Sequence, residues 1–272
     1  MKNAMFDPFG DFETAGYPHN IRGDKDQKVI KQFEHILFRA NLDAALAHLA
    51  ACKKPTCRDF LSVHRILFSD YYPWAGQDRS STIPNSAVKK ADVLFAHPQS
   101  ARLAIEHGLR LGQDIVVMNS KPGEVMGLFA YGHPFLDGNG QTMLLVHIEL
   151  AHRAGFPIAW EKTKKSDYLS ALSEEIMSPG RGILDAYLLQ FKDPCINRKE
   201  WGASILSIKE LDGLDDANQI DGDLSDVTVA EKYRKFEEKR GYVYVALQSE
   251  EPKSDARNDQ VTLKSSDYGL KF

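Results

Sequence analysis

The sequence has few cysteines, no long apolar run and little excess charge. Its three cysteines, Cys52, Cys57 and Cys195, are an odd number without C-x-x-C spacing, which is typical of reduced thiols rather than of disulfides or a metal site. No stretch is long enough to cross a bilayer, and the polar segment from Met1 to Glu13 does not resemble a signal peptide. These shortages predict a cytoplasmic protein without a membrane anchor.

The charge balance makes nucleic acid and anionic membranes unexpected as partners. The chain carries 34 Lys and Arg against 38 Asp and Glu, a net charge of −4. Nothing therefore predicts electrostatic binding to nucleic acid or to an anionic membrane. What the sequence does contain is 43% hydrophobic residues over a length of 272, which is enough for one sizeable core and a small second unit.

The stretch from His133 to Thr142 joins two apolar segments that both have helical character. The upstream helix is predicted from Pro122 to Tyr131, with Ser120 as its candidate N-cap. The downstream helix is predicted from Thr142 to Ala154, with Gly155 as its stop. This arrangement places the glycines of the stretch at or just before a helix N-terminus, which attracts anions and phosphate above all.

Each polar residue of this loop has a possible chemical role. The backbone N–H groups around Gly138, Asn139 and Gly140 are candidates for binding phosphate. Asp137 is a candidate ligand of a Mg²⁺ ion that also touches phosphate oxygens, although it could instead be only an N-cap. His133 is the group most able to accept a proton near neutral pH. Together these features favour phosphoryl or nucleotidyl transfer.

The rest of the core predicts about seven helices. After an irregular segment at 1–23, a helix is expected from Asp24 to Ala51, with a break near Asn41 and a buried face that includes Val29 and Ile36. Further helices are expected from about 55 onward and at 98–111, 165–177 and 182–192. The last two follow the loop, and Leu103 is one candidate core residue of the helix at 98–111. Three histidines in the first helices are expected at the surface or its boundary rather than as ligands: His35, His48 and His64.

Helical periodicity is lost between Gln77 and Phe95. Ser80 to Ile83 is predicted to form a strand, 84–86 a turn, and Ala87–Val88 a second strand. A ribbon of two strands is marginal alone, so it must lean on the helices or gain order from a partner.

Beyond Pro194 the composition changes. The segment 194–272 is predicted to be a small, partly mobile, mixed α/β extension, with a charged helix at 230–240 and a strand at 242–247. Residues 221–226 superficially resemble a calcium loop, but they lack its correct glycine position and its closing glutamate, so no calcium site is expected.

The central loop resembles the signature of Fic-domain proteins, H-P-F-x-(D/E)-G-N-G-R-x-x-R, at eight consecutive positions from His133 to Gly140. Residues 72–76 look like the segment that enters that family's β-hairpin flap, and residues 16–23 look like its usual opening. The resemblance covers Gly16 to Lys192. It implies a mainly α fold in which a Fic-type helical domain at 24–193 carries a short hairpin flap, followed by the C-terminal extension.

The resemblance also implies an activity, a protein adenylyltransferase that moves AMP from ATP to a Tyr, Ser or Thr hydroxyl of a target protein. His133 would be the general base, Asp137 would hold Mg²⁺, and the residues of the α-helix N-terminus would bind the nucleotide: Gly138, Asn139, Gly140 and Gln141. Phe135 would anchor the loop in the core. The flap would pair with an extended segment of the target through Ser81, Thr82 and Ile83.

Two departures from the family pattern leave alternatives open. Gln141 stands where the family has its first arginine, and Leu144 stands where it has its second. Losing a charge-assisted hydrogen bond costs roughly 1.5–3 kcal/mol, which predicts a weakened enzyme. The same change also fits a related transferase with another donor, such as phosphocholine, UMP or phosphate, and an inactive Fic fold that serves as a binding module.

Regulation by an internal inhibitory helix is not expected. Members of the family that carry such a helix show the pattern (S/T)-x-x-x-E-(G/N), and Ser170 to Glu174 has the spacing but is followed by Glu175. Leu144 would also offer no partner to the inhibitory glutamate. We therefore expect either an antitoxin-like inhibitory protein or no need for restraint, in a protein that works in the cytoplasm or is delivered into that of a host cell.

Overall fold

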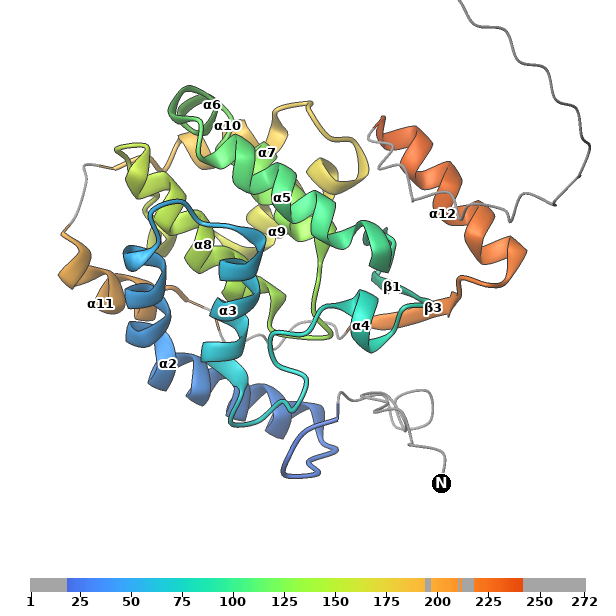
Figure 1. Cartoon of the computed structure of the whole chain (residues 1–272). Coiled ribbons are helices and arrows are strands. Elements are labelled where there is room, and N and C mark those ends of the chain that lie inside the picture. The colour runs from blue at the N-terminus through green and yellow to red at the C-terminus, as the bar shows by residue number, and fades with distance from the viewer. Residues whose placement is uncertain (1–18, 194–196, 210, 212–217, 242–272) are drawn as a thin grey trace, which may run out of the picture.

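The computed structural model describes residues 19–193, 197–209, 211 and 218–241. Its fold is mainly α with one small antiparallel sheet, as the sequence predicts (Figure 1). The longer helices are α2 (Gln27–Ala51), α3 (Cys57–Phe68), α5 (Ala101–Gly112), α7 (Pro122–Gly132), α8 (Asn139–Arg153), α9 (Lys165–Met177) and α12 (Val227–Arg240). The shorter ones are α4 (Arg79–Thr82), α6 (Ile115–Ser120), α10 (Ile183–Leu189) and α11 (Trp201–Leu206), with 3-10 turns at Pro98–Ser100, Trp160–Lys162 and Arg198–Glu200. The strands are β1 (Ser86–Lys90), β2 (Val93–Leu94) and β3 (Gln219–Asp223).

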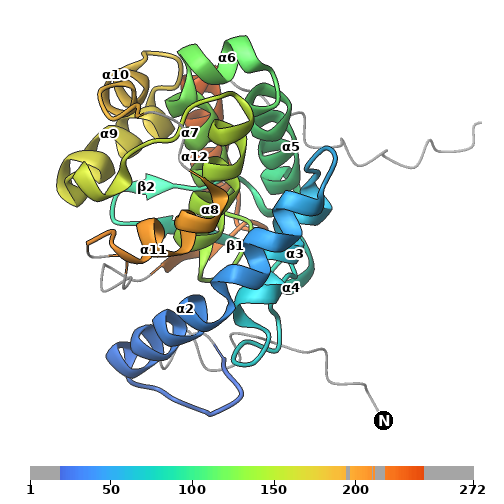
Figure 2. The same cartoon turned by 90° about the vertical axis from the view of Figure 1, so that its left-hand side faces the viewer.

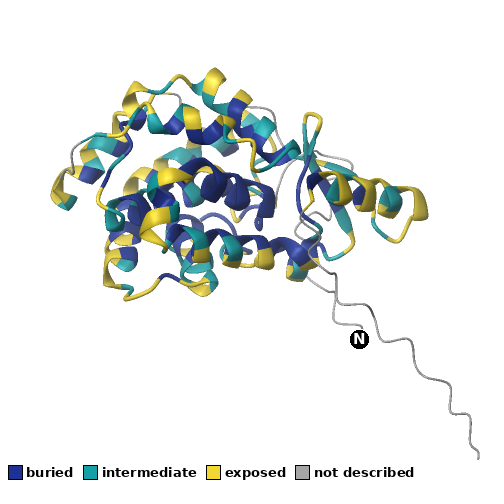
Figure 3. Ribbon diagram, turned by 90° about the horizontal axis from the view of Figure 1, so that it is seen from above, coloured by how far each residue is buried: buried dark blue, intermediate teal, exposed yellow. Residues whose placement is uncertain are grey.

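Helix α7 lies at the centre of the fold, and every one of its residues is buried. Helices α5, α9 and α10 pack around it, while α2 and α3 pack on the neighbouring helix α8. Figure 3 shows buried residues along the inner helices and exposed ones on the outer turns. The loop between α7 and α8 therefore leaves one buried helix and enters another, which holds both of its ends firmly in place.

Helix α2 is continuous where a break near Asn41 was expected. Instead of interrupting the helix, the Asn41 side chain donates a hydrogen bond to the Leu67 carbonyl of α3 at 3.0 Å. The buried face also differs from the prediction, because Val29 and Ile36 are 39% and 57% exposed. Leu103 of α5 is likewise exposed. These helices have apolar residues on more than one face, and only their packing partners decide which face is buried.

The boundaries of the central helices shift from the predicted ones. Ser120 is not the N-cap of α7, because it ends α6 and its hydroxyl donates to the carbonyls of Val116 and Val117. Lys121 precedes α7 in its place. Helix α8 begins at Asn139, before the expected Thr142, so the Gly140 backbone already belongs to its first turn.

The predicted first strand of the hairpin is wrong. Ser80 to Ile83 was expected to be extended, but Arg79–Thr82 forms the short helix α4. The hydroxyls of Ser80 and Ser81 both donate to the Asp78 carboxylate, so short polar side chains stabilise a turn at the expense of a strand. The hairpin follows directly, with Lys89 opposite Leu94 across β1 and β2.

A third strand completes the sheet from the far end of the chain. The strand order is β2-β1-β3, with Ser86 opposite Asp223, so β1 is the middle strand. Helix α12 follows β3 and places Tyr233 against β1, where its hydroxyl donates to the Val88 carbonyl at 3.1 Å and accepts from the Val88 N–H at 3.0 Å. Figure 1 shows β3 and α12 beside β1. The strand expected at 242–247 lies outside the described residues.

The C-terminal extension also packs on the helical domain. The Arg240 guanidinium lies over the Tyr131 ring at 3.2 Å from its centroid, and its Nε donates to the Ile176 carbonyl of α9. Across the described ranges, no helix combines the length and apolar character needed to cross a bilayer.

Candidate functional site

The loop between α7 and α8 borders a cavity of about 370 Å³. This volume lies within the range of small-molecule sites in proteins. Its walls include the first turn of α8, Lys31 and Glu34 from α2, the hairpin from Lys90 to Val93, and Asn218 just before β3. Figure 2 shows how α2, α8, α9 and the sheet surround this region. The cavity brings together all of the predicted loop residues: His133, Asp137, Gly138, Asn139, Gly140 and Gln141.

His133 is held at the start of the loop in a strained backbone conformation. It caps α7 with a φ of +40°, in the left-handed region that non-glycine residues rarely adopt. Its ring stacks on Phe95 with centroids 3.6 Å apart and planes 2° from parallel. Its Nε2 is buried without a hydrogen-bond partner among the described residues. Burial, followed by the charges of Arg79 and Lys90, holds the pKa of His133 well below its usual range, so the imidazole is unprotonated at neutral pH.

Arg79 fixes the backbone of the loop, and sequence reasoning missed it. The buried guanidinium donates from Nε to the His133 carbonyl at 2.7 Å and from one terminal nitrogen to the carbonyls of Gly132 and Ala96. Its backbone N–H donates to Pro134. Burial lowers the pKa of Arg79 to about 10, which leaves it charged at neutral pH. In the sequence Arg79 stands in a polar stretch that resembles a surface turn.

The loop is closed internally by Asn139 and anchored by Phe135. The Asn139 side chain accepts a hydrogen bond from the Phe135 N–H and donates one to its carbonyl. The Phe135 ring is fully buried, as predicted, and stacks on His64 at 3.7 Å between centroids. The expected surface position of His64 is therefore wrong. Its ring accepts from the Gly76 N–H and bonds the Asp137 carbonyl, because burial favours a neutral ring with both nitrogens paired.

The first turn of α8 lines the cavity and brings the N–H groups of a helix N-terminus to it. The first N–H groups of a helix have no partner within it, and those of Asn139, Gly140 and Gln141 belong to this turn. The Gln141 side chain is 5% exposed, lines the cavity, and its Nε2 has no partner within the described structure. Leu144 also lines the cavity and adds an apolar surface there.

The Asp137 carboxylate forms an ion pair with a lysine of this chain. Lys31 of α2 lies with its Nζ 2.5 Å from Asp137 Oδ1 and 3.5 Å from Glu34 Oε2. Despite burial, the charges of Asp137 and Glu34 raise the pKa of Lys31 above its ordinary value. Burial, reinforced by the Asp137 charge, raises the pKa of Glu34 to about 7, although the Tyr72 hydroxyl donates to it at 2.8 Å. Sequence reasoning missed this cluster, because α2 lies far from the loop in the chain.

The arrangement at Asp137 does not fit the Mg²⁺ ion that the family resemblance implies. Mg²⁺ requires oxygen ligands at about 2.0–2.1 Å in octahedral geometry. Asp137 Oδ1 is already paired with the Lys31 ammonium and with the Gly138 N–H at 2.9 Å. An ion placed there would lie next to a positive charge, so it would have to displace Lys31.

The residues predicted for the flap do not border the cavity. Thr82 and Ile83 are buried in and beside α4, and neither they nor Ser81 line the cavity wall. The hairpin residues that do line it are Lys90, Ala91 and Val93. A hairpin was correctly predicted in this region, but its strands lie later in the chain than predicted.

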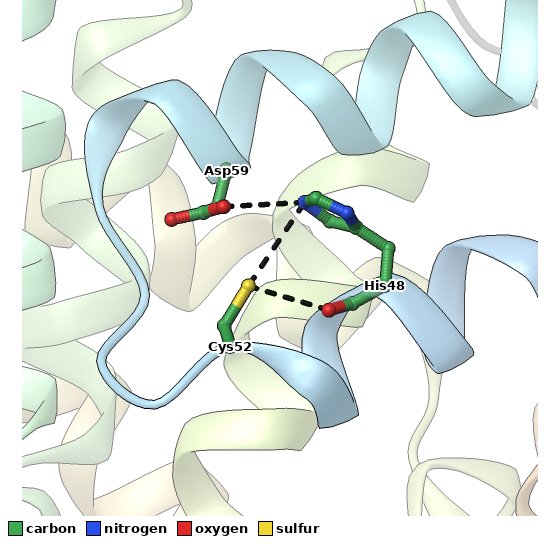
Figure 4. A group of neighbouring side chains, drawn as sticks. All are labelled: His48, Cys52 and Asp59. Atoms are coloured by element: carbon green, nitrogen blue, oxygen red, sulfur yellow. Dashed lines mark hydrogen bonds and ion pairs between the residues drawn. The ribbon is translucent and has the colours of Figure 1, made fainter.

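A second group of potential ligands lies away from the cavity, where α2 meets α3 (Figure 4). His48 Nε2 is 3.3 Å from Asp59 Oδ1 and 4.0 Å from Cys52 Sγ. Asp59 also forms the capping box of α3 with Thr56, and the Cys52 thiol donates to the His48 carbonyl. Burial, followed by the hydrogen bond to Asp59, raises the pKa of Cys52 to about 11. The capping box accounts for the position of Asp59 in this group.

Comparison with known proteins agrees with this geometry. Residues 54–151 match the model of the Fic/DOC family, a range that includes the hairpin, the loop and most of α8. The chain is 31% identical over 172 residues to the protein adenylyltransferase VbhT of Bartonella schoenbuchensis, a match that covers 62% of this chain and 35% of that protein. It is 26% identical over 188 residues to the probable protein adenylyltransferase y4lH of Sinorhizobium fredii, covering 62% of this chain and 88% of that protein.

Solved structures share the fold at lower identity. The BepC effector of Bartonella tribocorum, determined with bound AMPPNP, superposes with a TM-score of 0.54 at 16% identity over 67% of this chain and 95% of that one. The N-terminal Fic domain of a putative cell filamentation protein from Bartonella quintana, determined with bound ADP, gives 0.54 at 17% identity over 72% and 96%. Residues 54–151 thus match the Fic/DOC family, as the loop predicts, and the fold resembles that of the solved Fic-domain structures. It spans about a third of the length of VbhT.

Proposed function

We propose that this chain is a nucleotidyltransferase that moves AMP from ATP to a Tyr, Ser or Thr hydroxyl of a target protein. The observation that carries the proposal is that one cavity brings together the neutral His133 ring, whose Nε2 has no partner among the described residues, and the N-terminus of α8. The first is a general base and the second a phosphate site. The names of the two adenylyltransferase relatives, and the nucleotides bound in the two Bartonella structures, support the same donor.

The proposed reaction forms one P–O bond and breaks another. The target hydroxyl oxygen attacks the α-phosphorus of ATP, the bond to the bridging oxygen breaks, and pyrophosphate leaves. His133 Nε2 accepts the hydroxyl proton. Stacking on Phe95 fixes the direction of the ring, and burial holds the pKa of His133 below its usual range, so the ring is neutral before the transfer.

The phosphates would bind at the first turn of α8. Its N–H groups would meet the negative charge that develops on the leaving pyrophosphate. Gln141 Nε2 adds a neutral donor where the family pattern has an arginine. Because a neutral amide has neither charge nor a bidentate fork, we expect transfer slower than with arginine, on the order of tenfold to a hundredfold. No step is assigned to Mg²⁺, since Asp137 Oδ1 is paired with the Lys31 ammonium.

The target would dock on the free edge of the hairpin. Both edges of β1 are occupied, by β2 and by β3, so an added strand cannot pair with it. Within the described residues β2 pairs only with β1, and its Val93 lines the cavity. We therefore propose that the target pairs with β2 and not with Ser81, Thr82 and Ile83. Strand addition at β2 would carry a side-chain hydroxyl of the target towards His133.

A donor with fewer phosphate charges is the second candidate. Gln141 and Leu144 both line the cavity, and neither carries the charge that a triphosphate clamp would use. UMP, phosphocholine or phosphate transfer fits this wall equally well in chemical terms. The third candidate is an inactive Fic fold that serves as a binding module. This candidate predicts that no nucleotide binds.

Labelling with radioactive ATP tests the proposal. The parent chain, His133→Ala and Gln141→Arg are each incubated with α-labelled ATP and a bacterial or host-cell extract, and AMP incorporation is measured. We expect slow labelling by the parent, none by His133→Ala, and labelling raised about tenfold or more by Gln141→Arg. Labelling that survives His133→Ala would remove the histidine from its role. Binding of another nucleotide in place of ATP by all three chains would favour the second candidate.

An inhibitory antitoxin-like protein stays a prediction, as does work in the cytoplasm of the source cell or of a host. The buried Leu144 gives an inhibitory glutamate no cationic partner in this cavity. Co-purification of a small protein with the native chain would support such a partner. Harmless expression of the chain alone would count against it.

A further inference from the structure

We propose that Lys31 takes, beside Asp137, the place that a divalent cation would hold, so that nucleotide phosphates bind to this chain without Mg²⁺. The inference rests on the proposed function in one respect, namely that the cavity receives a nucleotide. It goes beyond that function because it assigns the cation of the site to a residue of α2, outside the loop and outside residues 54–151 that match the family model.

The position of the ammonium group is the first support. Lys31 Nζ lies 2.5 Å from Asp137 Oδ1, so the ammonium group is in direct contact with the carboxylate that was predicted to bind the metal ion. Lys31 and Asp137 both line the cavity that contains the first turn of α8. A phosphate bound at that turn would therefore find a positive charge in the same cavity, and lysine is a common phosphate ligand that acts as a point charge.

The surroundings of Lys31 hold it in that position. Its side chain is only 12% exposed and lies between two carboxylates, Asp137 and Glu34. Glu34 is itself buried and is fixed by the Tyr72 hydroxyl at 2.8 Å. If Lys31 left, the buried Glu34 carboxyl would lose its cation and would have to take up a proton. A divalent ion entering beside Asp137 would have to overcome this arrangement or sit against a like charge.

Lys31 could supply a positive charge that the cavity wall lacks at Gln141. The cavity lacks the arginine of the family pattern at this position, and Gln141 offers only a neutral amide. Lys31 restores one positive charge to the phosphate region from a different helix. The family motif alone cannot show this, because the motif covers only the loop and α8.

Calorimetry with the non-hydrolysable analogue AMPPNP tests the inference in two buffers, one with EDTA and one with Mg²⁺. We expect the parent to bind with nearly the same affinity in both. Lys31→Met should lose about tenfold or more in EDTA and recover with Mg²⁺, because Asp137 is then free to take the ion. Lys31→Arg should keep the behaviour of the parent. Lys165→Met, which alters another lysine of the same cavity, should leave the Mg²⁺ dependence unchanged.

A stability control is needed because Lys31→Met leaves Glu34 buried without its cation. The double variant Lys31→Met with Glu34→Gln removes both charges and keeps an acceptor for the Tyr72 hydroxyl. Its thermal unfolding should match that of the parent closely enough for calorimetry. If the parent binds AMPPNP about tenfold more tightly with Mg²⁺ than with EDTA, the inference is overturned, while the proposed transfer stands.

A metal titration without nucleotide separates the two proposals. Mn²⁺ binding is followed by electron paramagnetic resonance for the parent, for Lys31→Met and for Lys31→Met with Asp137→Asn. We expect one site in Lys31→Met that is weaker or lost in the other two. Equal Mn²⁺ binding by the parent and Lys31→Met would overturn the role of Lys31. Failure of AMPPNP to bind the parent in either buffer would overturn the proposed nucleotide transfer, whatever the Mn²⁺ titration shows.

Discussion

Two glycines of the loop, Gly138 and Gly140, have different physical reasons for being glycine. Gly138 has a φ of +70°, and a Cβ there would lie 2.6 Å from the Phe68 ring and 3.0 Å from His64 Nε2. Gly140 is in the first turn of α8, and a Cβ there would meet nothing within 4 Å. The first glycine is required by packing, and the second leaves room beside the N–H groups that face the cavity.

Alanine at each position separates these reasons. Gly138→Ala should destabilise the chain by about 1–3 kcal/mol, because of the clash with Phe68 and the left-handed backbone. Gly140→Ala should change the free energy of unfolding by less than about 0.5 kcal/mol. It should nevertheless weaken AMPPNP binding, since a methyl group would crowd the phosphate. Urea unfolding and calorimetry measure the two effects. AMPPNP binding unchanged by Gly140→Ala would mean that the phosphates lie elsewhere.

The sequence identified the residues of the loop but not those that hold it. His133, Asp137 and Gln141 stand together in the chain, so a short motif sufficed to find them. Arg79 and Lys31 reach the same loop from other elements, and their side chains look like ordinary surface charges in sequence. Long-range contacts of this kind leave no periodic or local pattern that a single sequence can reveal.

The hairpin makes contacts with the distant C-terminal segment that should stabilise it. Tyr233 of α12 bonds both the N–H and the carbonyl of Val88, a buried residue of the middle strand β1. No water can replace a partner that is lost at such a site without rearrangement. The hairpin, which a family resemblance presents as a flap, is thus the centre of a three-stranded sheet.

Tyr233→Phe should loosen this sheet. We expect a loss of about 1–3 kcal/mol and faster amide hydrogen exchange at Val88 and in β3, because the Val88 N–H and carbonyl both lose the Tyr233 hydroxyl, although the carbonyl still accepts from the Phe95 N–H. Tyr187→Phe is a matched control, since the Tyr187 hydroxyl bonds the N–H and carbonyl of Lys164, which is exposed to water. That control should cost less. Equal exchange at Val88 in the parent and Tyr233→Phe would show that α12 does not stabilise β1.

Elements with one apolar face were predictable, and those decided by short polar side chains were not. The helix at 165–177 was predicted with the bounds that α9 has. The segment 80–83 was predicted as a strand and is helical, because serine hydroxyls bond Asp78 locally. The pairing of β1 with β3 was not foreseen, since a five-residue strand in an acidic stretch carries almost no signal of its own.

For the whole molecule, a buried histidine predicts how stability depends on pH. His147 is fully buried, and its Nε2 bonds the Pro122 carbonyl at 2.8 Å. Burial lowers its pKa to about 4 from an ordinary value near 6.5. Above pH 6.5 the ring is neutral in both states and has no effect on stability. As the pH falls from 6.5 towards 4, only the unfolded chain takes up the proton, so the folded state loses stability.

His147→Gln should reduce this loss, because glutamine does not titrate and its amide can still donate to Pro122. Between pH 7.5 and pH 4.5 we expect the parent to lose about 2–3 kcal/mol more than the variant. Urea unfolding of both chains at the two pH values gives the difference directly. The other buried histidines are present in both chains and cancel from the comparison. Equal losses would mean that His147 takes up its proton in the folded state.

The middle position of β1 in the sheet affects how the protein folds during its synthesis. During synthesis the helices around α7 can pack as soon as they leave the ribosome, but β1 must wait for β3, which is made much later. Until then the wall of the cavity that carries Lys90 and Val93 has a single short partner strand, and Asn218 is missing from the loop. A nascent or shortened chain would thus contain His133 long before the wall of the cavity is complete. If the proposed transfer is correct, it would begin only after β3 has paired with β1.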